Sequence, residues 1–156
     1  MVTKQKISPK KPKKKLALIG WRELISFPDY DNFLLKAKID TGARSSALHA
    51  THLLPYENGE EKRIKFRVYQ SKMFHYIDAP ILGYKKVKNS FGVSEIRPII
   101  QMKIKLGKES WYTEITLARR SGMSYPMLIG RNSLKRKHII HPHKSFLQGK
   151  IKKSKK

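Results

Sequence analysis

Apolar and polar residues alternate over most of the middle of this chain. The segments RIKFRVY at 63–69, IRPIIQMKIKL at 96–106 and WYTEITL at 111–117 each place apolar side chains on one face of an extended backbone. A period of two predicts half-buried strands. Only RNSLKRK at 131–137 favours a helix, and it is short. The sequence therefore predicts a mostly β domain, either a small closed barrel or a closed sandwich, with one short C-terminal helix.

Lysine is concentrated at both ends of the chain. Residues 1–15 contain seven lysines and no acid, and residues 150–156 contain five more. Such runs repel themselves and offer little apolar surface to bury, so we expect disordered basic tails at 1–15 and 150–156 around one domain at 16–149. Removing these twelve lysines from the 35 basic residues leaves 23, against 11 acids. The domain itself is therefore basic, and we expect its partner or substrate to be an anion.

Several classes of protein are disfavoured. The chain contains no cysteine, which excludes disulfides, thiolate metal sites and a cysteine nucleophile. The apolar run LALIGW at 16–21 is interrupted by Arg22 and Glu23, so it is too short for a signal peptide or a membrane span. We therefore expect a cytoplasmic protein with no membrane partner. Nucleic acid would be contacted only non-specifically, through the lysine tails.

Two short segments carry the chemistry. In KIDTGARSSALHA at 38–50, an alternating apolar strand runs directly into Asp-Thr-Gly at 40–42. Amide hydrolysis without a metal or a nucleophile needs two carboxylates that share a proton. Since the chain contains one Asp-Thr-Gly, such a pair requires a two-fold dimer. In YPMLIGRNSL at 125–134, Gly130 permits close backbone approach, and the planar fork of Arg131 can hold a loop.

The order of Asp-Thr-Gly-Ala, a β-rich interval and then apolar-apolar-Gly-Arg-Asn resembles the retropepsin-like aspartic peptidases. The chain is most similar to a bacterial and archaeal branch labelled "ATP-dependent zinc protease" and associated with ATP-grasp glutamate ligases, over residues 17–149. The fold that this resemblance implies is a small closed barrel of the retropepsin (acid protease) type. The segments that carry it, in chain order, are IGWRELISFPD (19–29), KAKIDTGARSSALHA (36–50), VKNSFGVSEIRPII (87–100), MLIGRNSL (127–134) and HPHKSFL (141–147).

The resemblance implies a homodimer with one catalytic Asp per subunit. Asp40 would be that residue, Thr41 and Gly42 would hold its loop, and Thr41 would hydrogen-bond across the dyad. Structural support of the site is implied for Leu128, Ile129, Gly130, Arg131 and Asn132. Substrate binding is implied for Ala43, Arg44, Ser45, Ser90, Gly92, Glu95 and Arg97.

Two of these assignments have alternatives. Viral retropepsins tend to carry an acid just after Asp-Thr-Gly-Ala, where this chain has Arg44 followed by Ser45. Arg44 either binds an acidic substrate as a bidentate partner or forms a structural salt bridge. The segment that contains Ser90 and Gly92 falls where retropepsins carry the flap that closes over the substrate. The alternative is a plain hairpin with surface contacts.

Neither zinc nor ATP is expected as a cofactor. The chain has no His-Glu-x-x-His motif and no glycine-rich phosphate loop. His49 with His52 and His141 with His143 are the pairs that would have to converge on a metal, and supporting carboxylates are scarce near them. We therefore expect no metal and no cofactor, and we attribute the label "ATP-dependent" to the associated ligase.

The leading hypothesis is an aspartic endopeptidase that acts as a homodimer on an acidic substrate, for instance a glutamate-rich tail on a modified protein. The basic domain and the associated ligase motivate that choice of substrate. The first alternative is a basic β-barrel, including one of the OB type, that binds RNA or a ribosomal surface. The second alternative is a retropepsin-like dimer that recognises peptides without cleaving them.

Overall fold

The computed structural model describes residues 16–88, 91–119, 124–134 and 138–149. The tails expected at 1–15 and 150–156 lie outside the described residues. Within the described ranges, ten strands and one short 3-10 helix follow in the order β1 (Ala17–Phe27), β2 (Phe33–Ile39), β3 (Ser46–His49), β4 (Thr51–Asn58), β5 (Glu61–Gln70), β6 (Met73–Lys88), β7 (Ser94–Leu106), β8 (Glu109–Ala118), β9 (Met127–Ile129), η1 (Arg131–Ser133) and β10 (His138–Ser145).

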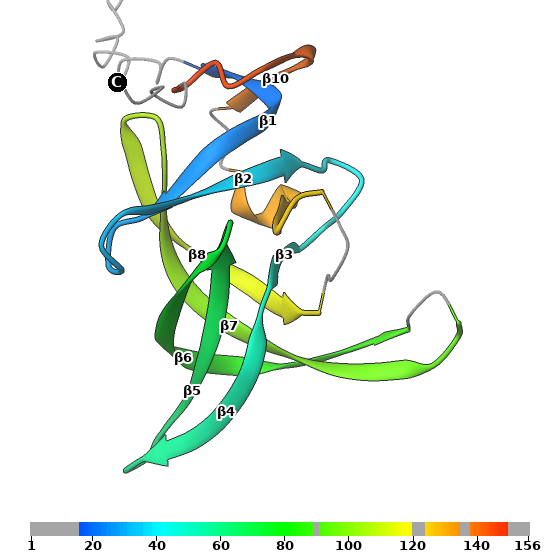
Figure 1. Ribbon diagram of the computed structural model, residues 1–156. Helices are drawn as coiled ribbons and strands as arrows, with labels where there is room; N and C mark the ends of the chain where they lie inside the picture. Colours follow the sequence, from blue (N-terminus) through cyan, green and yellow to red (C-terminus); the bar gives the residue numbers. More distant parts are fainter. Residues whose placement is uncertain (1–15, 89–90, 120–123, 135–137, 150–156) are drawn as a thin grey trace, which may run out of the picture.

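Six strands close into a barrel. Their order is β1–β2–β9–β3–β8–β7, and pairing of Ser26 with Lys105 joins β7 back to β1. β10 pairs in parallel with β1, and β6, β5 and β4 continue the sheet beyond β7. In Figure 1, β4, β5 and β6 lie below the barrel, and the β6–β7 hairpin projects to the right. The predicted mostly β chain with a small closed barrel is confirmed.

The observed helix is shorter than the one predicted at 131–137. Only Arg131–Ser133 is helical, with hydrogen bonds of the 3-10 kind from Ser133 N–H to the Gly130 carbonyl at 3.1 Å and from Leu134 N–H to the Arg131 carbonyl at 3.2 Å. Leu134 is already extended, with ψ at 120°. The rest of the predicted stretch, 135–137, lies outside the described residues. No helix among those that are described is long and apolar enough to cross a membrane.

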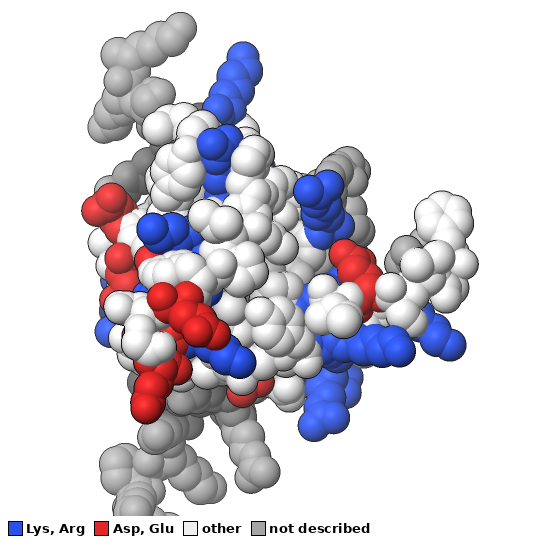
Figure 2. All heavy atoms as spheres, turned by 90° about the horizontal axis from the view of Figure 1, so that it is seen from below, with Lys and Arg blue, Asp and Glu red and all other residues white. Residues whose placement is uncertain are grey.

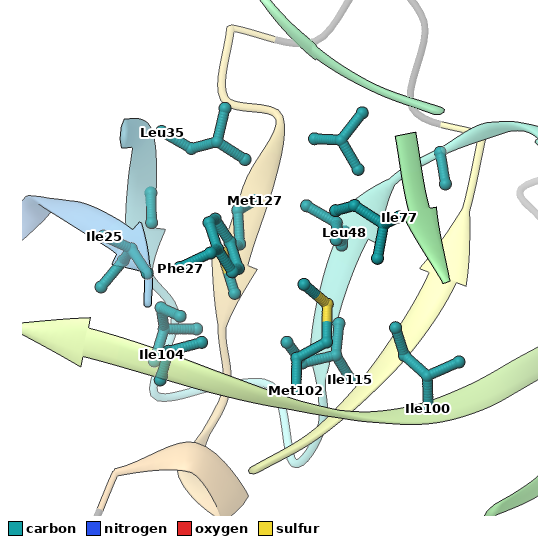
Figure 3. Packing of buried hydrophobic residues seen from close by; sticks show 14 of the residues in the cluster. Ile25, Phe27, Leu35, Leu48, Ile77, Ile100, Met102, Ile104, Ile115 and Met127 are labelled. Carbon is teal, nitrogen blue, oxygen red and sulfur yellow. The ribbon is translucent and has the colours of Figure 1, made fainter. Parts of the chain in front are cut away.

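The alternating residues fill the barrel. In β7, every second residue from Ile100 to Leu106 is buried, and the lysines between them are turned away from the core. Figure 3 shows Phe27 of β1, Ile104 of β7 and Met127 of β9 converging on one space. Burying each such side chain contributes about 1.5–3 kcal/mol to folding. The period of two therefore identified the inner face of the barrel correctly.

A buried carboxylate ties the C-terminal segment to the barrel. Glu23 of β1 is fully buried. Its carboxylate accepts hydrogen bonds from the backbone N–H groups of Gly20 at 2.7 Å, Leu147 at 2.9 Å and Gln148 at 3.0 Å. These donors replace the water that the charged group loses on burial. The segment after β10 is thereby held beside β1.

A second polar cluster lies on the outer face of the β4–β5–β6 sheet, around Asp78 of β6. Arg63 Nε donates to the Asp78 carboxylate at 2.9 Å, and the Tyr56 hydroxyl donates to the same carboxylate. The Tyr30 hydroxyl donates to the Asp78 carbonyl at 2.8 Å. Burial opposes ionisation of Asp78, but the hydrogen bonds from Tyr56 and Arg63 outweigh it and lower its pKa. The cluster therefore stabilises the ionised form of Asp78.

We expect Asp78→Asn to destabilise the protein at neutral pH, because the amide loses the ion pair with Arg63. The loss should be about 1 kcal/mol, since 37% of the Asp78 side chain is exposed and solvent screens the pair. Because the pKa of Asp78 is lower in the folded protein than in the unfolded chain, where it is about 4, the ionised carboxylate adds to the free energy of unfolding at pH above about 4. That contribution is lost as the pH falls through the folded pKa. The difference from the native protein should therefore shrink in acid. Urea unfolding across pH measures it, with the exposed Glu57→Gln on β4 as control. A pH-independent difference would contradict this account.

Candidate active site

Asp40 lies at the C-terminal end of β2, where β2 runs parallel to β9. The Asp40 N–H donates to the Ile129 carbonyl at 2.8 Å. The Asp40 carboxylate oxygen Oδ1 accepts the Gly42 N–H at 3.1 Å, and the Asp40 carbonyl accepts the Ala43 N–H at 3.2 Å. This turn holds a half-buried carboxylate in one orientation. We call residues 40–45 the Asp loop.

The Asp loop is tied to the segment that follows β9. Arg131 N–H donates to the Ala43 carbonyl at 2.9 Å, and Asn132 N–H donates to the Arg44 carbonyl at 2.9 Å. The Arg131 guanidinium reaches the Thr41 carbonyl at 2.7 Å. Backbone and side chain of the same arginine thus bind two points of one loop, which restricts its movement.

Gly130 begins this second loop, residues 130–133, which we call the Gly-Arg loop. Gly130 is buried, and a Cβ at this position would lie 2.5 Å from the backbone carbonyl group of Ser45. Non-bonded contacts of a Cβ atom are essentially never that short, so any side chain would push the loops apart. The glycine is required by close approach of two backbones, which is the role that the sequence predicts for it.

A chain of buried hydroxyl groups lies beneath the two loops. Ser46 Oγ accepts the Gly130 N–H at 3.0 Å and hydrogen-bonds to Ser133 Oγ, which accepts from the Thr113 hydroxyl at 2.8 Å. Trp111 Nε1 donates to the Ser133 carbonyl at 2.9 Å. Each of these buried groups has a partner, so the network holds the loops in place without burying a charge.

The long hairpin of β6 and β7 lies beside the Asp loop. Lys85 of β6 extends its ammonium to Ser45 Oγ at 3.4 Å. Gly92 lies near the hairpin's turn with φ at +77°, a conformation that favours glycine. Ser90, which the resemblance places in the flap, lies outside the described residues. The hairpin thus contacts the Asp loop through Lys85, and its role as a flap stays a prediction.

Glu95 and Arg97 are neighbours on β7 and contact each other. Arg97 Nη2 donates to the Glu95 carboxylate at 3.2 Å, and both side chains are partly exposed. The Arg97 Nε is buried and has no hydrogen-bond partner among the residues that the structure describes. The surface contact proposed as the alternative for these two residues is thus present, within a hairpin that also contacts the Asp loop.

In this closed β barrel, the Asp40 carboxylate lies at the end of a strand, and the loop that carries it is hydrogen-bonded to a Gly-Arg-Asn turn. A family model described as "Retropepsin-like aspartic endopeptidase RimB" matches residues 18–151. The chain belongs to this family. The resemblance noted in the sequence is confirmed.

Relatives of this chain are named as glutamate ligases, which agrees with the ligase-associated branch that the sequence resembles. The chain is 32% identical over 139 residues to a "Probable alpha-L-glutamate ligase" of Parasynechococcus marenigrum (strain WH8102), and 32% identical over 136 residues to a protein of the same name from Shewanella pealeana. These matches cover 86% and 85% of this chain but 30% of each relative. The chain thus spans about a third of the curated relatives that it matches.

A solved structure shows the same fold. A crystal structure of a Legionella pneumophila protein of unknown function superposes with a TM-score of 0.74 and 28% sequence identity, covering 85% of this chain and 98% of that one. A protein of nearly the same extent therefore shares this fold.

Among the described residues of this retropepsin-like barrel, no three His, Cys, Asp or Glu side chains come together as a possible metal site. His49 lies on β3 and His52 on β4. His141 and His143 lie together on β10, with ring centroids 6.2 Å apart. The two histidine pairs considered in the sequence therefore do not form a shared cluster within the described part of the chain.

Neither Lys85 nor the hydroxyl network of Ser46, Thr113 and Ser133 was predicted from the sequence. Ser46 and Ser133 each lie next to a recognised motif, so their proximity to the loops offered a signal. Thr113 and Lys85 had none, because each contacts a residue that is distant in sequence: Ser133 is 20 residues from Thr113, and Ser45 is 40 residues from Lys85. Their alternating positions matched those of ordinary strand residues.

We expect Gly130→Ala to destabilise the protein by about 1–3 kcal/mol, because its Cβ would overlap the Ser45 backbone. The matched control is Gly83→Ala in β6, where a Cβ meets nothing within 4 Å and no positive φ is required. Thermal unfolding of both variants measures the difference. Equal melting temperatures would show that the two loops separate at little cost.

Proposed function

We propose that this chain is one subunit of a homodimeric aspartic endopeptidase in which Asp40 of each subunit supplies one carboxylate of the catalytic dyad. The observation that carries the proposal is the fixed position of Asp40 in a chain of the retropepsin-like family. The backbone N–H of Asp40 donates to the Ile129 carbonyl, and its Oδ1 accepts the Gly42 N–H. Because the chain contains one Asp-Thr-Gly, the dyad needs a two-fold axis beside the Asp loop.

Two carboxylates at close range share one proton, since like charges there cannot both ionise. The ionised Asp40 takes a proton from a water molecule as the water oxygen attacks the scissile carbonyl carbon. The protonated Asp40 of the other subunit gives its proton to the carbonyl oxygen. As the resulting tetrahedral species collapses and its C–N bond breaks, the Asp40 that took the water proton gives it to the leaving amine. The other Asp40 takes a proton from a hydroxyl group of the tetrahedral species, which restores the shared proton of the dyad. Holding each carboxylate in one orientation is what the turn at Gly42 contributes.

The proposed substrate is an acidic peptide, with a glutamate-rich tail as the favoured form. Arg44 and Arg131 are exposed on the two loops, and within the described residues neither forms an ion pair. In Figure 2, red side chains gather mainly on the left, and blue ones predominate on the right, the side to which the β6–β7 hairpin projects in Figure 1. An anionic chain is drawn to such a surface. The ligase name of the relatives supports a functional link to glutamate addition.

We expect Asp40→Asn to reduce cleavage of an oligoglutamate-tailed peptide by about 10²- to 10⁴-fold, because the neutral amide can neither accept nor donate the shared proton. Product masses across the acidic to neutral pH range give the rate. The matched control is Asp31→Asn, an exposed residue at φ 56°, which asparagine tolerates. Sedimentation velocity on the native protein tests the dimer. A dimer that cleaves neither acidic nor neutral peptides would favour recognition without hydrolysis.

A further inference from the structure

One face of the β6–β7 hairpin is turned toward the Asp loop, and the other face is turned away from it. The register pairs Lys85 with Arg97 and Val87 with Glu95, so these odd-numbered residues share one face of the hairpin. Residues one position away along each strand occupy the opposite face. The contact of Lys85 with Ser45 Oγ at 3.4 Å shows that the face carrying Lys85 is turned toward the Asp loop.

Two cations of this region are already engaged. Arg97 is paired with Glu95 at 3.2 Å, and Arg131 donates to the Thr41 carbonyl at 2.7 Å. Lys85 is exposed, and within the described ranges no carboxylate forms an ion pair with it. Its contact with a neutral hydroxyl is long for a hydrogen bond. An ammonium carries three donors, so Lys85 retains donors for a ligand.

The pair of Lys85 and Ser45 has the donors that a carboxylate requires. Since Ser45 Oγ accepts from Lys85, the hydroxyl proton of Ser45 can be donated elsewhere. A carboxylate placed between them would accept one bond from the ammonium and one from the hydroxyl, and charge-assisted bonds of this kind are the stronger ones. For Arg44, the residue that the sequence suggests for this role, the described part of the chain shows no side-chain contact that would hold its guanidinium above the loop.

We propose that Lys85, assisted by Ser45, binds a carboxylate side chain of the substrate and sets the preference of this site for acidic residues. The inference rests on the proposed function, in that it places the substrate along the Asp loop under the hairpin. Lys85 is on this account a specificity residue outside the recognised sequence motifs. It acts on binding and takes no part in proton transfer.

The test compares Lys85→Gln with Lys86→Gln, both built on the Asp40→Asn background so that peptides bind without being cut. Both variants remove one positive charge, but Lys86 lies on the opposite face of the hairpin, paired with Ile96. Fluorescence anisotropy at physiological salt gives the affinity for a labelled oligoglutamate peptide and for its oligoglutamine counterpart.

We expect Lys85→Gln to weaken oligoglutamate binding by about tenfold or more, with oligoglutamine binding unchanged. Lys86→Gln should change neither affinity by more than about twofold, the effect of a screened surface charge. Ser45→Ala should give a smaller loss in the same direction. Circular dichroism melts confirm that the exposed substitutions leave the fold intact. Equal losses for Lys85→Gln and Lys86→Gln, or equal losses for the two peptides, would overturn the inference.

The same variants with Asp40 restored separate this inference from the proposed function. If Lys85→Gln and Lys86→Gln slow the cleavage of oligoglutamate equally, the peptidase proposal stands and the proposed role of Lys85 is overturned. If the native protein cleaves neither peptide while Lys85→Gln alone weakens oligoglutamate binding, Lys85 is upheld as a carboxylate-binding residue, and the catalytic proposal fails.

Discussion

The rest of this structure depends on the close approach of two backbones, the Asp loop at 40–45 and the Gly-Arg loop at 130–133. The contact requires that position 130 has no side chain, because a Cβ there would lie 2.5 Å from the Ser45 carbonyl group. The hydrogen bond from Asp40 to Ile129 immediately precedes the crossing. The orientation of the carboxylate and the approach of the loops are therefore set together, and neither can change alone.

The support beneath this crossing consists of neutral groups. Ser46, Ser133 and Thr113 are all buried, and each satisfies the hydrogen-bonding needs of its neighbours. Burying an ion pair there would cost desolvation free energy, whereas hydroxyl groups hold the same geometry at lower cost. Barrel closure supplies the other part of the support, because β9 lies between β2 and β3 and brings both loops to one end of the sheet.

The β6–β7 hairpin and the proposed second subunit complete the site from outside the barrel. The hairpin is long enough to carry Lys85 to Ser45 while its other strand continues into the core at Ile100. A single chain thus presents one carboxylate, two exposed arginines and a lysine beside one loop. Such a surface suits the acidic substrate that we propose.

The sequence by itself determined which faces of the strands are buried, where Asp40 ends a strand, and why Gly130 has no side chain. These are local properties: alternation follows from the pleat of a strand, and turn residues report the backbone conformation that they adopt. It also placed a short helical turn after Gly130, but overestimated its length, since Leu134 is extended. Only the tertiary structure decided that Thr113 supports Ser133 and that Lys85 reaches Ser45. Each contact joins a strand to a loop or 3-10 turn that is distant in sequence and lies nearby only in the folded chain, and a residue's own neighbours in the chain carry no record of such partners.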